Sequence, residues 1–224
     1  MLTDAQLFAC GAFADYESYY APPAVEVRET APRRLRPPTS DVEATRSRLA
    51  LLLGDAPPVP VPPIVTVFAI DGRVPAADRV ARIKAELRRA PSAVIAEWQR
   101  HGGRIDVVPG PHVASHPDAG SLRARHPDAC GWFSLPRRLI AIAADCRDGT
   151  ALHELGHWHD RAWWSGRFSS LPEWRRICQG RAATAIRFSD CEHYAEDFAL
   201  FYLGSETRAN MPPEARRFIV ETTG

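Results

Sequence analysis

Proline is concentrated in the first 63 residues of this 224-residue chain. Ten of the twenty prolines lie there, among them Pro57-Pro58 and Pro62-Pro63. Proline lacks a backbone N–H and fixes φ, so this density opposes regular helices and sheets and favours extended backbone. The pattern predicts a Pro-rich, partly ordered N-terminal arm over residues 1–63 and a folded domain over residues 64–224.

Composition and charge exclude several classes of protein. With 45% hydrophobic residues, 25% charged residues and a formal net charge of +1, the chain has the composition of an ordinary globular protein, and no excess charge indicates nucleic acid as a partner. No apolar run approaches the ~20 residues that a membrane span requires. Five cysteines without CxxC spacing argue against a disulfide framework and a cysteine-based zinc site. The oligomeric state is not specified by the sequence.

The N-terminus lacks the basic region that precedes the apolar core of a Sec signal peptide, and it carries Asp4, Asp15 and Glu17. We therefore expect a protein that is cytoplasmic or secreted by a signal-independent system.

Hydrophobic patterning after residue 64 predicts an α+β fold. β-branched and apolar runs predict strands at 64–70, 104–108, 131–135 and 138–144. Helical spacing covers 76–100, where Pro91 starts a second segment, and residues 109–129 are expected to form a loop. The C-terminal half is expected to be helical, over 148–164, 172–187, 190–203 and 213–222.

Residues 150–160 carry two histidines and a glutamate at a spacing typical of zinc hydrolases. His153 and His157 are four residues apart, so on a helix their side chains differ by about 40° in direction and lie about one turn apart. Both imidazoles can therefore bind one metal ion. Glu154, next to the first histidine, is placed to act as a general base for attack by water. This HExxH pattern predicts a zinc (Zn2+) site with Glu154 as its catalytic residue.

A catalytic zinc ion usually has three protein ligands. Asp160 and Trp163 stand where a metzincin has a glycine and its third histidine, which excludes that class. His159 lies on a different face of the same helix from His157, and we expect it to face solvent or to cap the helix.

The segment 190–198 offers the third ligand. Glu192 and Glu196 are again four residues apart and share one helix face. One carboxylate can bind zinc while the other accepts the free N–H of a ligating histidine. The spacing alone does not decide which glutamate is the ligand.

At these positions the sequence resembles a known family. His153-Glu154-Leu155-Gly156-His157, followed by Glu192-x-x-Ala195-Glu196-x-Phe198, resembles the catalytic domain of anthrax toxin lethal factor and the related secreted bacterial endopeptidases that cut Pro-Pro bonds. The resemblance extends to the hairpin at 131–140 and covers about residues 90–224. It implies a zincin-like metalloprotease fold of the gluzincin type, with a small mixed sheet and an active-site helix. It also implies a zinc endopeptidase acting on a protein or peptide substrate, as a bacterial toxin or effector.

The resemblance also implies roles for single residues. His153, His157 and Glu192 would bind zinc, Glu154 would be the base, and Glu196 would orient a ligating histidine. The family has a tyrosine seven residues before its ligand glutamate, where this chain has Ala185.

Other residues are candidates for contacts with the substrate. Tyr194, His193, Arg187 or a residue of the N-terminal arm would replace the family tyrosine as the transition-state donor, or the protein is a weak or repurposed member of that family. Tyr194 and His193 could equally serve in packing. We expect the substrate backbone to pair with the strand predicted at 138–144, through residues Arg138, Leu139, Ile140, Ala141 and Ile142. The loop histidines His112, His116 and His126 would line the cleft or lie at the surface.

Two other functions remain compatible with the sequence. The absence of the family tyrosine at Ala185 would suit a non-catalytic zinc-containing binding module. An intracellular regulatory metallohydrolase would use the same ligand and base residues. Retention of Glu154 favours the peptidase, because a purely structural zinc site has no use for a base beside the metal.

Overall fold

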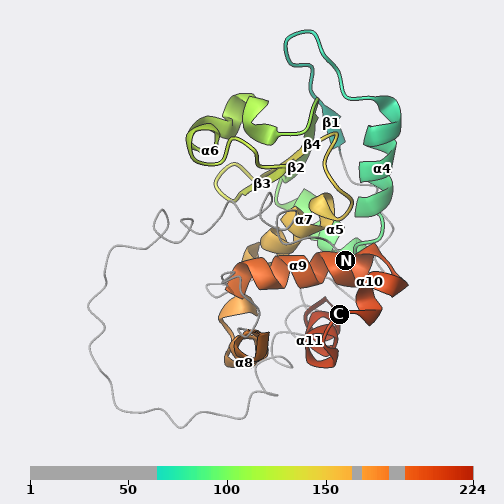
Figure 1. The fold of residues 1–224 in the computed structure, drawn as a ribbon, viewed down its shortest axis with the longest axis vertical. Coiled ribbons are helices and arrows are strands. Elements are labelled where there is room, and N and C mark those ends of the chain that lie inside the picture. Colours follow the sequence, from blue (N-terminus) through green and yellow to red (C-terminus); the bar gives the residue numbers. More distant parts are fainter. Residues whose placement is uncertain (1–64, 163–167, 182–189, 224) are drawn as a thin grey trace, which may run out of the picture.

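The computed structural model describes residues 65–162, 168–181 and 190–223 (Figure 1). The N-terminal arm predicted at 1–63 lies outside the described residues, and so does its predicted boundary with the folded domain. Ala185 also lies outside them.

A four-stranded mixed sheet forms the upper half of the described fold in Figure 1. Its strands are, in chain order, β1 (Val65–Val67), β2 (Arg104–Val108), β3 (Gly131–Ser134) and β4 (Leu139–Ala143), and they lie side by side in the order β1-β2-β4-β3. β1, β2 and β4 are parallel, and β3 is antiparallel to β4. The predicted α+β class with a small mixed sheet is confirmed.

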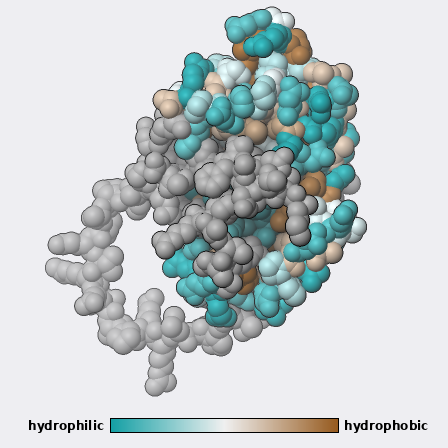
Figure 2. All heavy atoms as spheres, in the orientation of Figure 1, coloured by the Kyte–Doolittle hydropathy of each residue, from teal (hydrophilic) through white to brown (hydrophobic). Residues whose placement is uncertain are grey.

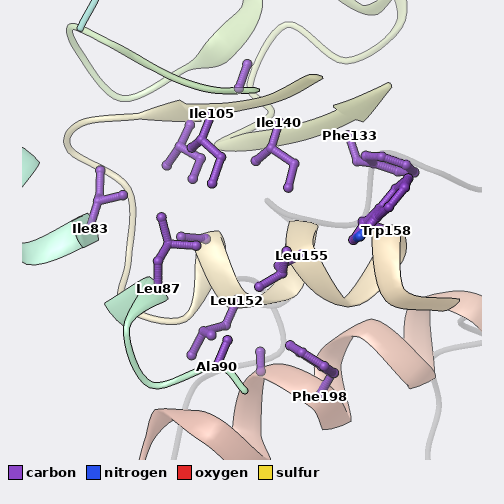
Figure 3. Packing of buried hydrophobic residues seen from close by; sticks show 14 of the residues in the cluster. Ile83, Leu87, Ala90, Ile105, Phe133, Ile140, Leu152, Leu155, Trp158 and Phe198 are labelled. Atoms are coloured by element: carbon purple, nitrogen blue, oxygen red, sulfur yellow. The ribbon is translucent and has the colours of Figure 1, made fainter. Parts of the chain in front are cut away.

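Two helices before β2 and one after β4 cover one face of this sheet. They are α4 (Ala77–Leu87), α5 (Ser92–Arg100) and α7 (Thr150–Ala162). Pro91 precedes α5, as its fixed φ predicts. Figure 3 shows Ile83 and Leu87 of α4, Ile105 and Ile140 of the sheet, and Leu152 of α7 in one apolar layer. Burial of this layer fixes α7 beneath the sheet.

The segment 109–129 is folded, whereas the sequence predicted a loop. It contains two 3-10 turns and a short helix: η1 (Val113–Ser115), η2 (Pro117–Ala119) and α6 (Gly120–Arg125). Ile105 faces α7 in Figure 3, so its neighbour Asp106 points to the opposite face of the sheet. There Asp106 is buried and hydrogen-bonded to His116 of this segment at 3.1 Å. The segment therefore covers the face of the sheet that α7 does not.

Within the described ranges the C-terminal half is helical, as predicted, while positions 163–164 and 182–187 of the predicted helices lie outside those ranges. Its elements are η3 (Phe168–Ser170), α8 (Pro172–Arg181), α9 (Asp190–Leu203), α10 (Ser205–Ala209) and α11 (Pro213–Thr223). The sequence did not predict α10, because five residues are too few for a helical period to be recognised.

No helix in the described ranges combines the length and the apolar character needed to cross a bilayer. On the face drawn in Figure 2, the described surface is mainly hydrophilic, with scattered apolar residues.

Candidate metal centre

α7 carries the two histidines of the HExxH pattern on one face. Their ring centroids lie 4.8 Å apart, with the ring planes at 86°. The first turn of the helix is held by backbone and side-chain hydrogen bonds: the His153 amide donates to the Gly149 carbonyl at 2.8 Å, and the Thr150 hydroxyl donates to the Arg147 carbonyl at 3.0 Å. The helix thus directs both imidazoles toward one point, as the spacing predicts.

α9 crosses α7 at a glycine. A Cβ atom at Gly156 would lie 2.9 Å from the Ala195 Cα and 3.1 Å from the Phe198 Cβ, both closer than ordinary contact. Only glycine lets the two backbones approach this closely. One turn before Ala195 on α9, Glu192 is thereby brought to the two histidines.

Glu192 bridges the two imidazoles. Its Oε2 lies 3.3 Å from His153 Nε2, and its Oε1 lies 3.3 Å from His157 Nε2. All three residues are buried, and the atoms they offer lie within 4.8 Å of one another. Tetrahedral zinc with bonds of about 2.0–2.1 Å requires ligand atoms about 3.3–3.4 Å apart. The spacing of the carboxylate from each imidazole therefore fits a zinc ion.

Hydrogen bonding supports the same fit. Three buried atoms, His153 Nε2, Glu192 Oε1 and Glu154 Oε2, have no hydrogen-bond partner among the residues that the structure describes. Leaving buried polar atoms unpaired costs about 1–3 kcal/mol each. A cation at the centre of the group would satisfy the first two. Within the described ranges, His153, His157 and Glu192 are the one group of three such residues that could hold a metal ion.

The electrostatic environment favours positive charge at this point. Burial lowers the pKa of His153, but the carboxylates of Glu192 and Glu196 outweigh burial and raise it well above its ordinary value. Burial raises the pKa of Glu192, yet the two histidines more than compensate and hold it well below its usual range. The carboxylates that favour a proton on His153 would equally favour a metal cation.

The Glu154 side chain lies beside the metal group and against Gly131, the first residue of β3. A side chain at Gly131 would overlap the Glu154 carboxylate, and its Cβ would lie 2.8 Å from Thr150 Cγ2. Glycine at this position therefore leaves the space that the base occupies. Burial raises the pKa of Glu154, while the neighbouring histidines and a hydrogen bond to the Phe133 backbone act against that rise. A carboxylate with a raised pKa is suited to accepting a proton.

Glu196 lies behind the first histidine. Its Oε2 is 3.3 Å from His153 Nδ1, on the side of the ring away from Glu192, and 3.6 Å from Arg147 Nη2. An Nδ1–H that donates to a carboxylate leaves Nε2 as the atom free to ligate. Glu192 and Glu196 thus occupy different positions around His153, and it is Glu192 that reaches both imidazoles.

The structure does not bring Tyr194 to the metal group. It is two residues from Glu192, about 200° around the helix, and its buried hydroxyl is 2.8 Å from His159 Nδ1 and 3.0 Å from Thr222 Oγ1. The donor role expected for Tyr194 does not fit this orientation. His193 is half-buried on α9.

His159 does not face solvent and does not cap the helix, so that expectation was wrong. Its side chain is buried against Tyr194 and Phe168, and burial lowers its pKa to about 3. The reason is that η3 and α9 cover the face of α7 that the sequence suggested was open.

β4 cannot receive the substrate as an added strand, which corrects the expectation for residues 138–142. It lies between β2 and β3, and both of its edges are hydrogen-bonded. β3 is the edge strand next to α7. The Ala143 amide donates to the Cys130 carbonyl, so the alternation of an antiparallel pair directs the backbone groups of Gly131 and Phe133 away from β4. Among the described residues, no strand pairs with the outer edge of β3, and this open edge lies at Glu154.

The loop histidines do not gather at this centre. His116 is fully buried on the face of the sheet away from α7, bonded to Asp106. His112 and His126 are half-buried in the same segment.

No protein-family model matches the chain, and no curated protein matches its sequence. Among solved structures, its fold is similar to that of the Pro-Pro endopeptidase PPEP-2 from Paenibacillus alvei, with a TM-score of 0.53 and 16% sequence identity. The match covers 65% of this chain and 91% of that chain. The chain therefore shares the α+β fold of that endopeptidase.

Proposed function

We propose that this protein is a zinc-dependent endopeptidase that hydrolyses a peptide bond in a protein substrate. The observation that carries the proposal is the buried group of His153, His157 and Glu192 with Glu154 beside it. Two imidazoles and one carboxylate form a ligand set of catalytic zinc, which keeps a fourth position for water or substrate.

When bound there, zinc supplies a Lewis acid that polarises a carbonyl and lowers the pKa of water toward ~7. Glu154 accepts the proton of the attacking water and passes it to the amine that leaves as the peptide C–N bond breaks. Gly131 and the backbone of Phe133 hold the carboxylate in place for both transfers. Glu196 holds His153 with its Nε2 toward the metal position.

The open edge of β3 supports an extended substrate. The Gly131 backbone and the Phe133 carbonyl point outward there, while the Phe133 amide bonds the Glu154 carboxylate. An antiparallel peptide paired with these outward groups would pass that carboxylate. In such pairing the hydrogen bonds are made to the peptide backbone, while alternate side chains of the peptide enter pockets. It favours a peptide over a small non-peptide substrate.

The resemblance to lethal factor extends the proposal to a toxin or effector protease. The structural neighbour is named for Pro-Pro bonds, so peptides that contain Pro-Pro belong in the first substrate set. Delivery into another cell would be tested by whether the cleaved protein belongs to the producing bacterium or to another organism.

Incubation of the full-length protein with a peptide library, followed by mass spectrometry of the products, tests the function. The matched control is Glu154→Gln, because the amide preserves the shape of a residue that is not a ligand. We expect this variant to keep the fold and to bind about one zinc ion per chain. Its cleavage rate should fall by about 10²–10⁴-fold, the usual contribution of a general base.

Undiminished cleavage by Glu154→Gln would contradict the mechanism. Zinc binding by the wild type without cleavage of any peptide would instead identify a non-catalytic zinc-containing module. Cleavage of a non-peptide substrate alone would identify a regulatory metallohydrolase.

A further inference from the structure

A glutamate from α4 reaches the first turn of α7, which carries His153 and Glu154. The Glu86 side chain is buried, and its Oε1 accepts a hydrogen bond from the Leu152 amide at 3.0 Å. The backbone of Gly149 and that of Ala151 also bond to this carboxylate. The first amides of a helix have no partner within it, so Glu86 caps α7 from a segment 66 residues earlier in the chain.

Arg82, one turn before Glu86 on α4, holds the connection that leads into α7. Its Nη2 donates to the Cys146 carbonyl at 2.7 Å and to the Ala144 carbonyl at 3.1 Å, and its Nη1 lies 2.6 Å from Asp148. The same face of α4 thus holds both the end of the sheet strand and the start of the helix. The depth and rotation of that first turn are fixed from α4.

The position of Glu86 matters for charge as well as for shape. The N-terminus of a helix carries partial positive charge, which opposes a metal cation bound by residues of the first turn. A buried carboxylate at that end offsets this field. A glutamine would keep the shape, but it would lose the charge and would turn an NH2 donor toward backbone donors.

We propose that Glu86 is a positioning residue of the metal centre: through the Leu152 amide it sets the place of His153 and Glu154 and balances the charge of the helix end. The inference rests on the proposed function, because it concerns affinity for the metal that this function requires.

The test compares full-length wild type, Glu86→Gln and the control Glu97→Gln. Glu97 is also buried, on the neighbouring helix α5, but its carboxylate pairs with Arg100 and His101 of its own segment. Three quantities are measured: the melting temperature of the metal-free protein, the Kd for zinc by competition with a chromophoric chelator, and the visible spectrum after loading with Co2+.

We expect Glu86→Gln to raise the zinc Kd by about 10–100-fold, the usual effect of a residue that orients a ligand, and to alter the Co2+ spectrum. Glu97→Gln should lower the melting temperature while it leaves the Kd and the spectrum as in the wild type. If the role of Glu86 were purely structural, Glu86→Gln would behave like Glu97→Gln: its melting temperature would fall, and its zinc Kd and Co2+ spectrum would stay as in the wild type.

The inference is overturned if the zinc Kd of Glu86→Gln is within twofold of the wild-type value and its Co2+ spectrum is unchanged. That result leaves the proposed function standing. If Glu86→Gln does not fold, Glu86→Asp keeps the charge and withdraws the carboxylate by one methylene. The same rise in Kd is expected of it, and wild-type affinity in that variant also overturns the inference. A wild type that binds no zinc contradicts the proposed function, and the inference falls with it.

Discussion

Substitution of Gly156 by alanine perturbs the crossing of α7 and α9 without removing any ligand. The added Cβ would lie 2.9 Å from Ala195 Cα, 3.1 Å from the Ala195 carbonyl oxygen and 3.1 Å from Phe198 Cβ. Two of these atoms belong to backbone, so no rotamer change relieves the overlap. Ordinary contact between carbon atoms is about 3.5–4.0 Å, and α9 must therefore move by roughly 0.5–1 Å.

This displacement is large for a metal site and small for the fold. Metal–ligand distances in a sound site agree with their usual values to about ±0.2 Å, and Glu192 stands one turn from the point of overlap. Overpacking typically costs about 1–3 kcal/mol of stability, whereas replacing a helical glycine by alanine returns about 1 kcal/mol. The variant should therefore stay folded and bind zinc at least about tenfold more weakly.

The assay is chelator competition for zinc, together with thermal unfolding of the metal-free protein. Gly204→Ala is the matched control, because its backbone is extended (φ 172°) and an added Cβ would meet nothing within 4 Å. Wild-type zinc affinity in Gly156→Ala would refute the role assigned to the close crossing. An equal loss of zinc affinity in Gly204→Ala would show that the effect is not specific to the crossing of α7 and α9.

Two further predictions concern α9. Glu192→Ala should lose zinc on dialysis against a mild chelator, whereas Glu196→Ala should retain zinc at about 10–100-fold lower affinity; the reverse result would exchange their roles, and retention by both would place the third ligand elsewhere. Tyr194→Phe removes the hydroxyl that pairs with His159 and Thr222, so unfolding should become easier by about 1–3 kcal/mol with zinc and kcat retained. A large fall in kcat with zinc retained would make Tyr194 the transition-state donor.

Local spacing was enough to predict the helical part of the site. His153 and His157 lie on α7, and Glu192 and Glu196 lie on α9, where their four-residue spacing predicts a shared face. The crossing that joins the two helices depends on Gly156, which stands within the HExxH pattern. A glycine in the middle of a helix is a signal of close packing that the sequence did offer.

The errors concern contacts between segments distant in the sequence. The order β1-β2-β4-β3 places β4 inside the sheet, and its uninterrupted apolar run Leu139–Ala143 is typical of such a strand. That run was misread as an edge. His159 was expected to face solvent or to cap the helix because it lies on a different face of the helix from His157, yet α7 is covered on that side too. The contact of Glu86 with Leu152 spans 66 residues and has no local pattern.

X-ray absorption at the zinc edge of the full-length protein tests the central claim most directly. Zinc held by His153, His157 and Glu192 predicts only nitrogen and oxygen neighbours, at about 2.0–2.1 Å, with the outer-shell scattering of two imidazoles. The spectrum of Glu192→Ala should differ or vanish. Sulfur neighbours at about 2.3 Å, or a wild-type spectrum in Glu192→Ala, would contradict the assignment of this group as the metal centre.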